Sequence, residues 1–237
     1  MQREGKGGAR VKAVKPRNEG RRQNSTRLLV VLGVGAVLVA GLLVALSALG
    51  EGGREDLGGI PQNGTTLGNP GAPVTILLYE DFQCPACGQF ARETLPEVVD
   101  SYVRPGDAKL VAETLAFLGP DSVPAARAAL AAGEQDLYWQ YAGLLFENQG
   151  AENSGYVSDE FLAGLAEETE GLDVARWQEA RDDASIEEEL GAVQQRANEG
   201  GVNSTPTLVV SGPEGETILR GAVPIEDVDL AVEEVGG

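Results

Sequence analysis

The pattern of apolar and polar positions predicts a chain that passes from strand to helix and back to strand. An uninterrupted apolar run at Val74–Tyr79, with prolines before it and acids after it, is typical of a buried central strand. A helix should follow from Pro85, because proline suits the first helical turn. Pro96 should kink or end that helix before residues 97–102 resume it. Residues 109–115 alternate well enough for a second strand.

A long helical section separates these elements from a second group of strands. Its apolar residues recur at helical spacing, and the helices expected there are residues 124–132, 137–145, 158–165 and 184–198. Ser158 is expected to cap the third of them, and Gly200 with Gly201 should end the fourth. The elements expected after them are strand 207–211, a turn at 212–215, strand 217–220 and an amphipathic helix over 225–235. This order indicates an α/β fold that contains a central sheet and an inserted block of helices.

Residues 28–49 form a different kind of segment. They carry no charge, and Ser47 is their only polar side chain, so their 22 residues match the roughly 20 apolar residues of a membrane-spanning helix. A signal peptide has an apolar region of only about 7–15 residues. This length favours a retained anchor over a cleaved signal, and both interpretations place the C-terminal part outside the cytoplasm.

The charge distribution supports this topology. Residues 1–27 hold nine Lys and Arg against two acids, a net charge of +7, whereas residues 28–237 hold nine against 35, a net charge of −26. By the positive-inside rule, the N-terminus should be cytoplasmic and the C-terminal domain extracytoplasmic. The expected organisation is a basic disordered tail over 1–27, a transmembrane anchor over 28–49, a Gly-rich linker over 50–66 and a folded domain over 67–237, with its helical insertion at about 120–198.

The composition excludes several classes of function. The chain has no histidine and only two cysteines, so it cannot contain a Ser-His-Asp triad, a His-ligated metal, a Cys₄ zinc site or an iron–sulfur cluster. We therefore expect no metal site. The acidic domain also argues against nucleic-acid binding, because binding phosphates requires Lys and Arg.

The two cysteines form a Cys-x-x-Cys motif, Cys84-Pro85-Ala86-Cys87. Haem attachment would need a histidine at position 88, which is Gly. A purely structural disulfide would close a very small loop and would stabilise little. The pattern favours a redox-active dithiol, with an inert structural bridge as the alternative. Cys84 stands where a strand turns into a helix N-terminus, and the N–H groups there stabilise a thiolate.

A second motif, Ser204-Thr205-Pro206-Thr207, directly precedes the predicted hairpin. By itself it is typical of an ordinary loop with a trans proline. After a Cys-x-x-Cys strand–helix unit, a cis Thr205–Pro206 bond beside the disulfide becomes the favoured interpretation, with the Thr205 backbone free to pair with an extended substrate.

Together, the two motifs resemble the DsbA-like group of thioredoxin-fold thiol-disulfide oxidoreductases, and most of all its membrane-anchored, BdbD-like bacterial members. The resemblance covers about 67–237. Pro206 follows Cys84 by 122 residues, which leaves room for the helical insertion of that group, and residues 139–149 and 171–173 are similar to segments of that insertion. The resemblance implies a thioredoxin fold, Cys84 as the attacking cysteine, Cys87 as the resolving cysteine and Pro206 as the cis-proline. It also implies that the Cys84–Cys87 disulfide serves as the redox centre without a further cofactor.

Two departures from that group affect the stability of the thiolate. Many members have a buried acid six residues before the first cysteine as a proton acceptor, but this position is Leu78, and nearby Glu80 and Asp81 are expected to point elsewhere. The strongest oxidants have a histidine between the cysteines, where this chain has Pro85 and Ala86.

These observations predict an extracytoplasmic, membrane-anchored thiol-disulfide oxidoreductase, in which Thr205 and Pro206 line the substrate groove. It is expected to act as an oxidase of unfolded or reduced secreted and envelope proteins. A membrane partner similar to DsbB or VKOR would re-oxidise it. The alternatives are a reductase or isomerase of the same fold, and a non-catalytic module with a structural disulfide.

Overall fold

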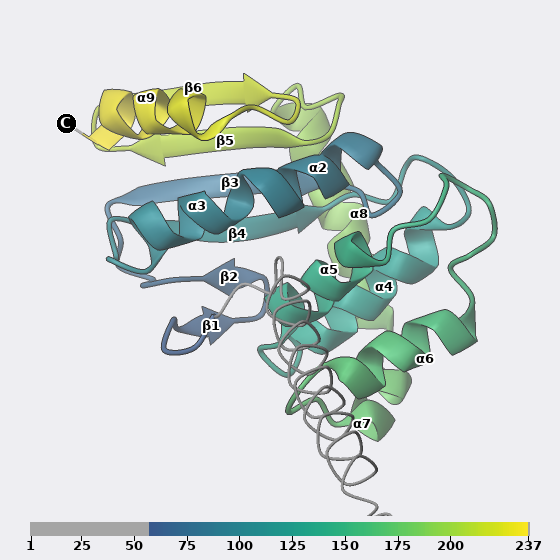
Figure 1. The fold of residues 1–237 in the computed structure, drawn as a ribbon. Helices are drawn as coiled ribbons and strands as arrows, with labels where there is room; N and C mark the ends of the chain where they lie inside the picture. The colour runs from purple at the N-terminus through teal and green to yellow at the C-terminus, as the bar shows by residue number, and fades with distance from the viewer. Residues whose placement is uncertain (1–56, 237) are drawn as a thin grey trace, which may run out of the picture. The chain divides into compact units, whose positions relative to one another are not determined.

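The computed structural model describes residues 57–236, which form a mixed six-stranded sheet with helices on both faces (Figure 1). The strands lie in the order β1-β2-β4-β3-β5-β6. Their bounds are β1 Gln62–Asn63, β2 Thr66–Leu67, β3 Val74–Glu80, β4 Ala108–Thr114, β5 Thr207–Gly212 and β6 Gly215–Arg220. The helices are α2 Pro85–Glu93, α3 Leu95–Val98, the π-helical turn η1 Val99–Val103, α4 Ser122–Gly133, α5 Tyr138–Glu147, α6 Asp159–Glu168, α7 Val174–Ala180, α8 Ala184–Glu199 and α9 Ile225–Gly236. The predicted α/β order of elements is confirmed.

β3 is a central strand of the sheet. It pairs in parallel with β4 and antiparallel with β5, with Tyr79 opposite Thr207. A parallel pair needs a crossover connection, which α2, α3 and η1 supply. The predicted break near Pro96 is present, because α2 ends at Glu93 and Pro96 stands in the first turn of α3.

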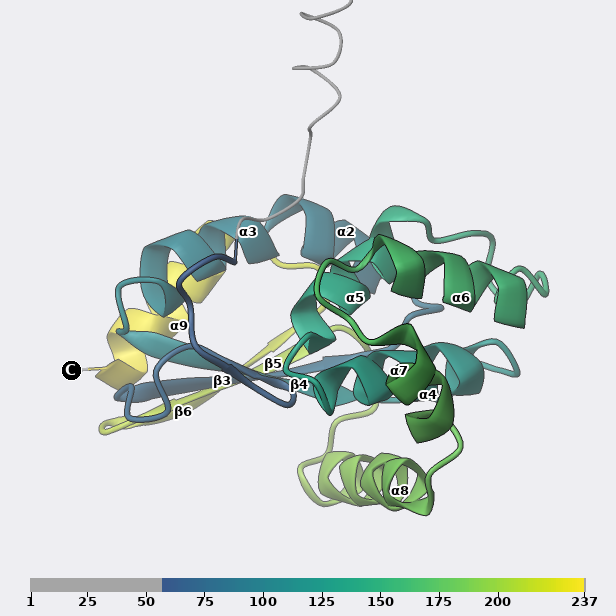
Figure 2. The ribbon, with the colours of Figure 1, turned by 90° about the horizontal axis from the view of Figure 1, so that it is seen from below.

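Alternate residues of β3 face opposite layers of helices. Figure 2 shows α2, α3 and α9 on one face of the sheet and α8 on the other. Ile76 and Leu78 are fully buried in the larger core cluster, whereas Tyr79 belongs to a smaller one that includes Val193 of α8. Because successive side chains of a strand point to opposite faces, Glu80 continues the row of Leu78 toward α2.

Helices α4 to α7 pack beside the C-terminal ends of β3 and β4 (Figures 1 and 2). Half of the residues of α4 are buried alanines, which allow close contact with α5, α7 and α8. The indole nitrogen of Trp177 in α7 donates a hydrogen bond to the Ala128 carbonyl at 2.8 Å. The sequence did not predict α7, since seven residues are too few for a clear helical period.

The predicted linker over 50–66 is wrong for its last ten residues. Leu57 and Ile60 are buried in the core, and β1 and β2 extend the sheet beyond β4. Strands of two residues leave no detectable alternation, so the pattern could not indicate them. The predicted tail over 1–27 and anchor over 28–49 lie outside the described residues. Between residues 57 and 236, no helix has the length and apolar character needed to span a membrane.

Candidate active site around Cys84 and Cys87

The two cysteines lie at the N-terminus of α2, immediately after β3. Cys84 is the N-cap residue in an extended conformation, Pro85 begins the helix and is exposed, and half-buried Ala86 follows. Both cysteines are free thiols, of which Cys84 is 7 % exposed and Cys87 only 1 %. The Cys87 backbone N–H donates to Cys84 Sγ at 3.4 Å. Cys84 Sγ is therefore directed at the helix N-terminus, as the sequence predicted.

The Thr205–Pro206 segment lies against this sulfur. The peptide bond between these two residues is cis, and Cys84 Sγ donates to the Thr205 carbonyl oxygen at 3.3 Å. The register of the sheet causes this proximity, because pairing Tyr79 with Thr207 sets the residues before β5 beside those after β3. The predicted juxtaposition of the two motifs, which are more than a hundred residues apart in sequence, is thus present in the structure.

The two thiols have opposite acidities. The pKa of Cys84 is lowered to about 6. The largest cause is a hydrogen bond with the Cys87 side chain, and burial opposes it. Hydrogen bonds with the Thr205 side chain and with the backbone N–H groups of Cys87 and Ala86 lower this pKa further. Burial, followed by the interaction with Cys84, raises the pKa of Cys87. The hydrogen bond that Cys84 donates to the Thr205 carbonyl belongs to its thiol form, whereas near neutral pH the lowered pKa favours the thiolate of Cys84 and Cys87 keeps its proton. This asymmetry suits thiol-disulfide exchange, in which one sulfur attacks and the other holds its proton.

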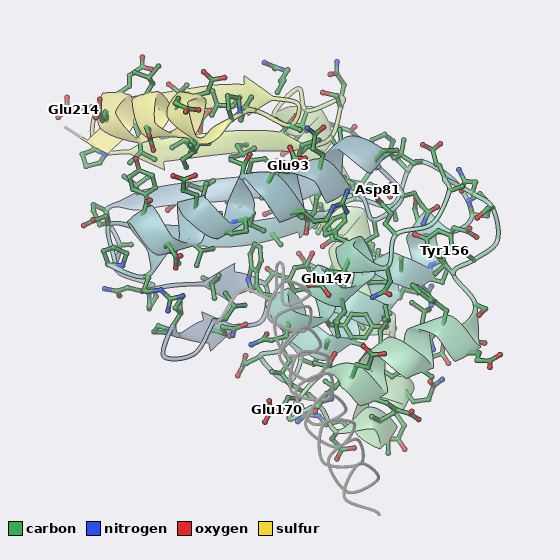
Figure 3. The ribbon with its side chains drawn as sticks, viewed as in Figure 1. Asp81, Glu93, Glu147, Tyr156, Glu170 and Glu214 are labelled. Carbon is green, nitrogen blue, oxygen red and sulfur yellow. The ribbon has the colours of Figure 1, made fainter. Side chains whose placement is uncertain are left out.

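The expectation that Glu80 and Asp81 point elsewhere is wrong for Glu80, whose charge interacts with both cysteines, but it holds for Asp81, whose carboxylate binds the loop between β4 and α4. Asp81 is fully buried at the turn after β3, and Figure 3 shows it near the start of α2. Its carboxylate accepts four hydrogen bonds, from the Gln83 N–H and Ser122 hydroxyl at 2.8 Å each and from the N–H groups of Phe117 and Leu118 at 3.0 and 3.1 Å. Asp81 therefore ties the loop that leads from β3 into α2, residues 81–84 (the cysteine loop), to the loop between β4 and α4.

Glu80 is 2 % exposed and has few polar partners. The hydroxyl of Tyr138 donates to its Oε1 at 2.9 Å, and this hydroxyl also shares a 2.5 Å hydrogen bond with Thr114. Burial raises the pKa of Glu80 to about 8, the Tyr138 hydrogen bond lowers it, and the negative charges of Asp81 and Cys84 raise it. Glu80 also helps to line a cavity of about 580 Å³ together with Ala91 of α2.

The two-residue spacing between Leu78 and Glu80 in the sequence indicates the position of Glu80, although related proteins carry their acid at the position of Leu78. Leu78 occupies the position where the family carries its acid, but Glu80 is two residues further along the same strand. Residues two apart in a strand share a face. Glu80 therefore points into the same layer as Leu78 and lies closer to the cysteines along the chain.

The segment between α5 and α6 of the helical insertion also holds the cysteine loop, which the sequence did not predict. Gln83 is 1 % exposed; its side-chain amide donates to the Tyr156 hydroxyl at 3.0 Å and accepts from the Asn153 N–H at 2.9 Å. Figure 3 shows Tyr156 beyond Asp81, on the segment that joins α5 to α6. Among the residues that the structure describes, no group of three or more His, Cys, Asp or Glu side chains is placed to bind a metal ion.

Comparisons with known proteins identify the family of this chain. A family model described as "Thioredoxin" matches residues 61–233. Disulfide bond formation protein D of Bacillus subtilis is 25 % identical over 191 residues, which cover 78 % of this chain and 83 % of that protein.

Solved structures show the same fold. DsbA of Chlamydia trachomatis is 25 % identical, with a TM-score of 0.63 over 72 % of this chain and 90 % of its own. BdbD of Bacillus subtilis in its oxidised form is 23 % identical, with a TM-score of 0.65 over 77 % of this chain and 96 % of its own. The predicted thioredoxin fold is confirmed, with its mixed sheet and added helices. The chain therefore belongs to the thioredoxin family and is a DsbA-like thiol-disulfide oxidoreductase.

Proposed function

We propose that this protein is an oxidase that donates the Cys84–Cys87 disulfide to reduced proteins outside the cytoplasm. The observation that carries the proposal is the difference between the two thiols, with the pKa of Cys84 lowered to about 6 and that of Cys87 raised. A stabilised Cys84 thiolate favours the reduced form of the pair, and this makes the disulfide oxidising. Disulfides also persist outside the cytoplasm, so the predicted location suits donation.

The chemical step begins with a substrate thiolate that attacks Cys84 Sγ. The Cys84–Cys87 bond breaks, a mixed disulfide forms between the substrate and Cys84, and Cys87 leaves as a thiolate. Glu80, whose pKa is raised to about 8, is protonated at neutral pH and is the nearby acid that can protonate Cys87. The cavity that Glu80 lines gives this acid a route for proton exchange with water.

A second substrate thiolate completes the transfer. It attacks the substrate sulfur of the mixed disulfide, forms the substrate's own disulfide and releases Cys84 as a thiolate. The substrate has then lost two electrons, which reside on the reduced Cys84–Cys87 pair. The Thr205 carbonyl, 3.3 Å from Cys84 Sγ, supports a role for Thr205 and Pro206 in holding an extended substrate beside the reacting sulfur.

The proposal includes a membrane anchor over residues 28–49 and a partner that re-oxidises the protein. The charge difference across that segment supports an extracytoplasmic domain. A quinone-linked membrane protein similar to DsbB or VKOR would accept the two electrons, and reduced secreted or envelope proteins would be the substrates. A reporter that works only outside the cytoplasm, fused to the C-terminus, tests the topology.

Paired cysteine variants of the full-length chain test the function. Cys87→Ser should accumulate mixed disulfides through Cys84, because Cys87 can no longer attack Cys84 Sγ and displace a substrate that lacks a second free thiol, and Cys84→Ser should trap none. Equilibration with glutathione should give a reduction potential of roughly −120 to −270 mV. Trapping by Cys84→Ser would reverse the two roles. A potential clearly below this range would support a reductase, and the absence of any trapped species would support a structural disulfide.

A further inference from the structure

A glutamine from the helical insertion contacts the backbone of the cysteine loop directly. Gln149 follows α5, and its side-chain Nε2 donates to the Phe82 carbonyl at 2.9 Å and to the Cys84 carbonyl at 3.0 Å. These carbonyls flank Gln83 in the turn that leads from β3 into α2. One side-chain amide thus fixes both ends of the segment that delivers Cys84 to the helix N-terminus.

The Cys84 carbonyl has a second role in this geometry. It accepts the first hydrogen bond of α2, from the Gly88 N–H at 3.1 Å, while the sulfur of the same residue accepts from the Cys87 N–H. The orientation of the Cys84 peptide group therefore determines both the start of the helix and the direction of the sulfur. A donor that holds this carbonyl also holds Sγ against the N–H groups that favour its thiolate.

Gly88 provides the space that this glutamine occupies. A Cβ atom at position 88 would lie 2.3 Å from Gln149 Oε1 and 2.9 Å from Arg92 Nη1. Both atoms are the ends of flexible side chains, so an alanine would displace them and leave the backbone in place. Arg92 makes its own contact with the insertion, donating from Nη1 to the Phe146 carbonyl at 2.7 Å.

We propose that Gln149 is a positioning residue for Cys84, which reaches from the helical insertion to fix the loop before α2, and that Gly88 is required because it leaves room for that side chain. This inference rests on the proposed exchange chemistry of Cys84 and extends it. The insertion would then contribute to the reactivity of the thiol in addition to covering the sheet.

The test is the pH dependence of Cys84 alkylation by iodoacetamide in the full-length reduced protein, with the modified cysteine identified by mass spectrometry. Gln149→Met keeps the length of the side chain and removes the donor. Alkylation at pH 5 should become about three- to tenfold slower, the effect of about one hydrogen bond on the thiolate, and the apparent pKa of Cys84 should rise.

Gly88→Ala separates this effect from a loss of stability. Alanine favours a helix over glycine and so offsets the lost hydrogen bonds of Gln149, which should leave the melting temperature close to that of wild type, yet alkylation at pH 5 should slow as it does in Gln149→Met. In the double variant the two effects should not add, because the alanine displaces a side chain that is already inactive. Arg92→Met should leave the pH profile unchanged, which assigns the effect of Gly88→Ala to Gln149.

Gln135→Met is the matched control. The Gln135 side chain also makes two hydrogen bonds to backbone, both to Asp173, but it lies within the insertion. Its loss should cost some stability and leave the pH profile of Cys84 unchanged. Unchanged profiles in both Gln149→Met and Gly88→Ala would overturn the inference. An ordinary thiol pKa for Cys84 in the wild-type protein would instead contradict the proposed function.

Discussion

The surroundings of Asp81 and Glu80 differ sharply, although the two acids are neighbours in sequence and both are buried where β3 ends. Four donors, three of them backbone N–H groups, converge on the carboxylate of Asp81. For Glu80, the hydrogen bond at its carboxyl comes from the Tyr138 hydroxyl, and burial raises its pKa to about 8. A buried acid that is fully hydrogen-bonded holds loops together, whereas one with few donors can gain and lose a proton near neutral pH.

The largest effect on stability should follow Asp81→Asn. The amide keeps the volume of the acid but replaces one acceptor oxygen with an NH₂ group, which in either orientation would face at least one backbone N–H donor. Because the site is fully buried, we expect the free energy of unfolding to fall by about 2–4 kcal/mol in denaturant titrations. Stability within about 0.5 kcal/mol of wild type would show that these hydrogen bonds do not hold the loops.

Glu80→Gln is the same change one residue earlier, and its effect on stability should have the opposite sign. The folded-state pKa of Glu80 is raised to about 8, above its unfolded value, so the wild-type protein loses stability as the pH rises from about 4.5 to about 8. Glutamine does not titrate, so the free energy of unfolding of the variant should increasingly exceed that of wild type across this interval, by on the order of a few kcal/mol at its upper end. At higher pH the difference should stay constant. Denaturant titrations at pH 5, 7 and 9 measure the difference.

Glu80→Gln should also transfer its disulfide to substrates more slowly than the wild-type protein. Without a group that protonates Cys87 as it leaves, disulfide transfer to a reduced peptide at pH 7 should fall by about tenfold or more. Asp81→Asn supplies the comparison under conditions in which it stays folded, because it retains Glu80. An equal loss of rate in both variants would mean that the loop geometry, and not the proton on Glu80, controls the reaction.

The parts of the site that depend on local sequence were predictable, and those that depend on tertiary contacts were not. Cys84 could be placed at a helix N-terminus because Pro85 and the preceding apolar run are adjacent to it. The Thr205–Pro206 segment could be placed only together with the Cys-x-x-Cys unit and not from its own residues, because the contact of Thr205 with Cys84 depends on the pairing of β3 with β5. The surroundings of Glu80 follow from the alternation of side chains along β3, which puts it on the face of Leu78, and not from the position of the acid in related proteins.

Local sequence predicts even less about the contacts that the helical insertion makes with the site. Gln149 contacts carbonyls more than sixty residues earlier in the chain, and nothing in its local sequence marks it as a partner of the cysteine loop. The short helix α7 and the two-residue strands β1 and β2 are stabilised by packing against distant elements, so their own residues carry too little periodicity to reveal them. The anchor over 28–49 stays a prediction from length and charge.

The smallest effect should follow Tyr138→Phe, which changes the surroundings of Glu80 without removing its acid. The hydroxyl of Tyr138 donates to Glu80, and this contact lowers the carboxyl's pKa against the larger effect of burial. Removing the hydroxyl takes away a stabilising partner of the ionised form, so the pKa of Glu80 should rise further. The alkaline limb of the pH–rate profile for disulfide transfer should move to higher pH by about one unit or less, since the change corresponds to one hydrogen bond. Thr114 also loses a partner, so unfolding should become easier by about 1 kcal/mol. A shift of the limb to lower pH would mean that Tyr138 stabilises the neutral acid, and Glu80 would then depend on its hydroxyl partner more than on burial.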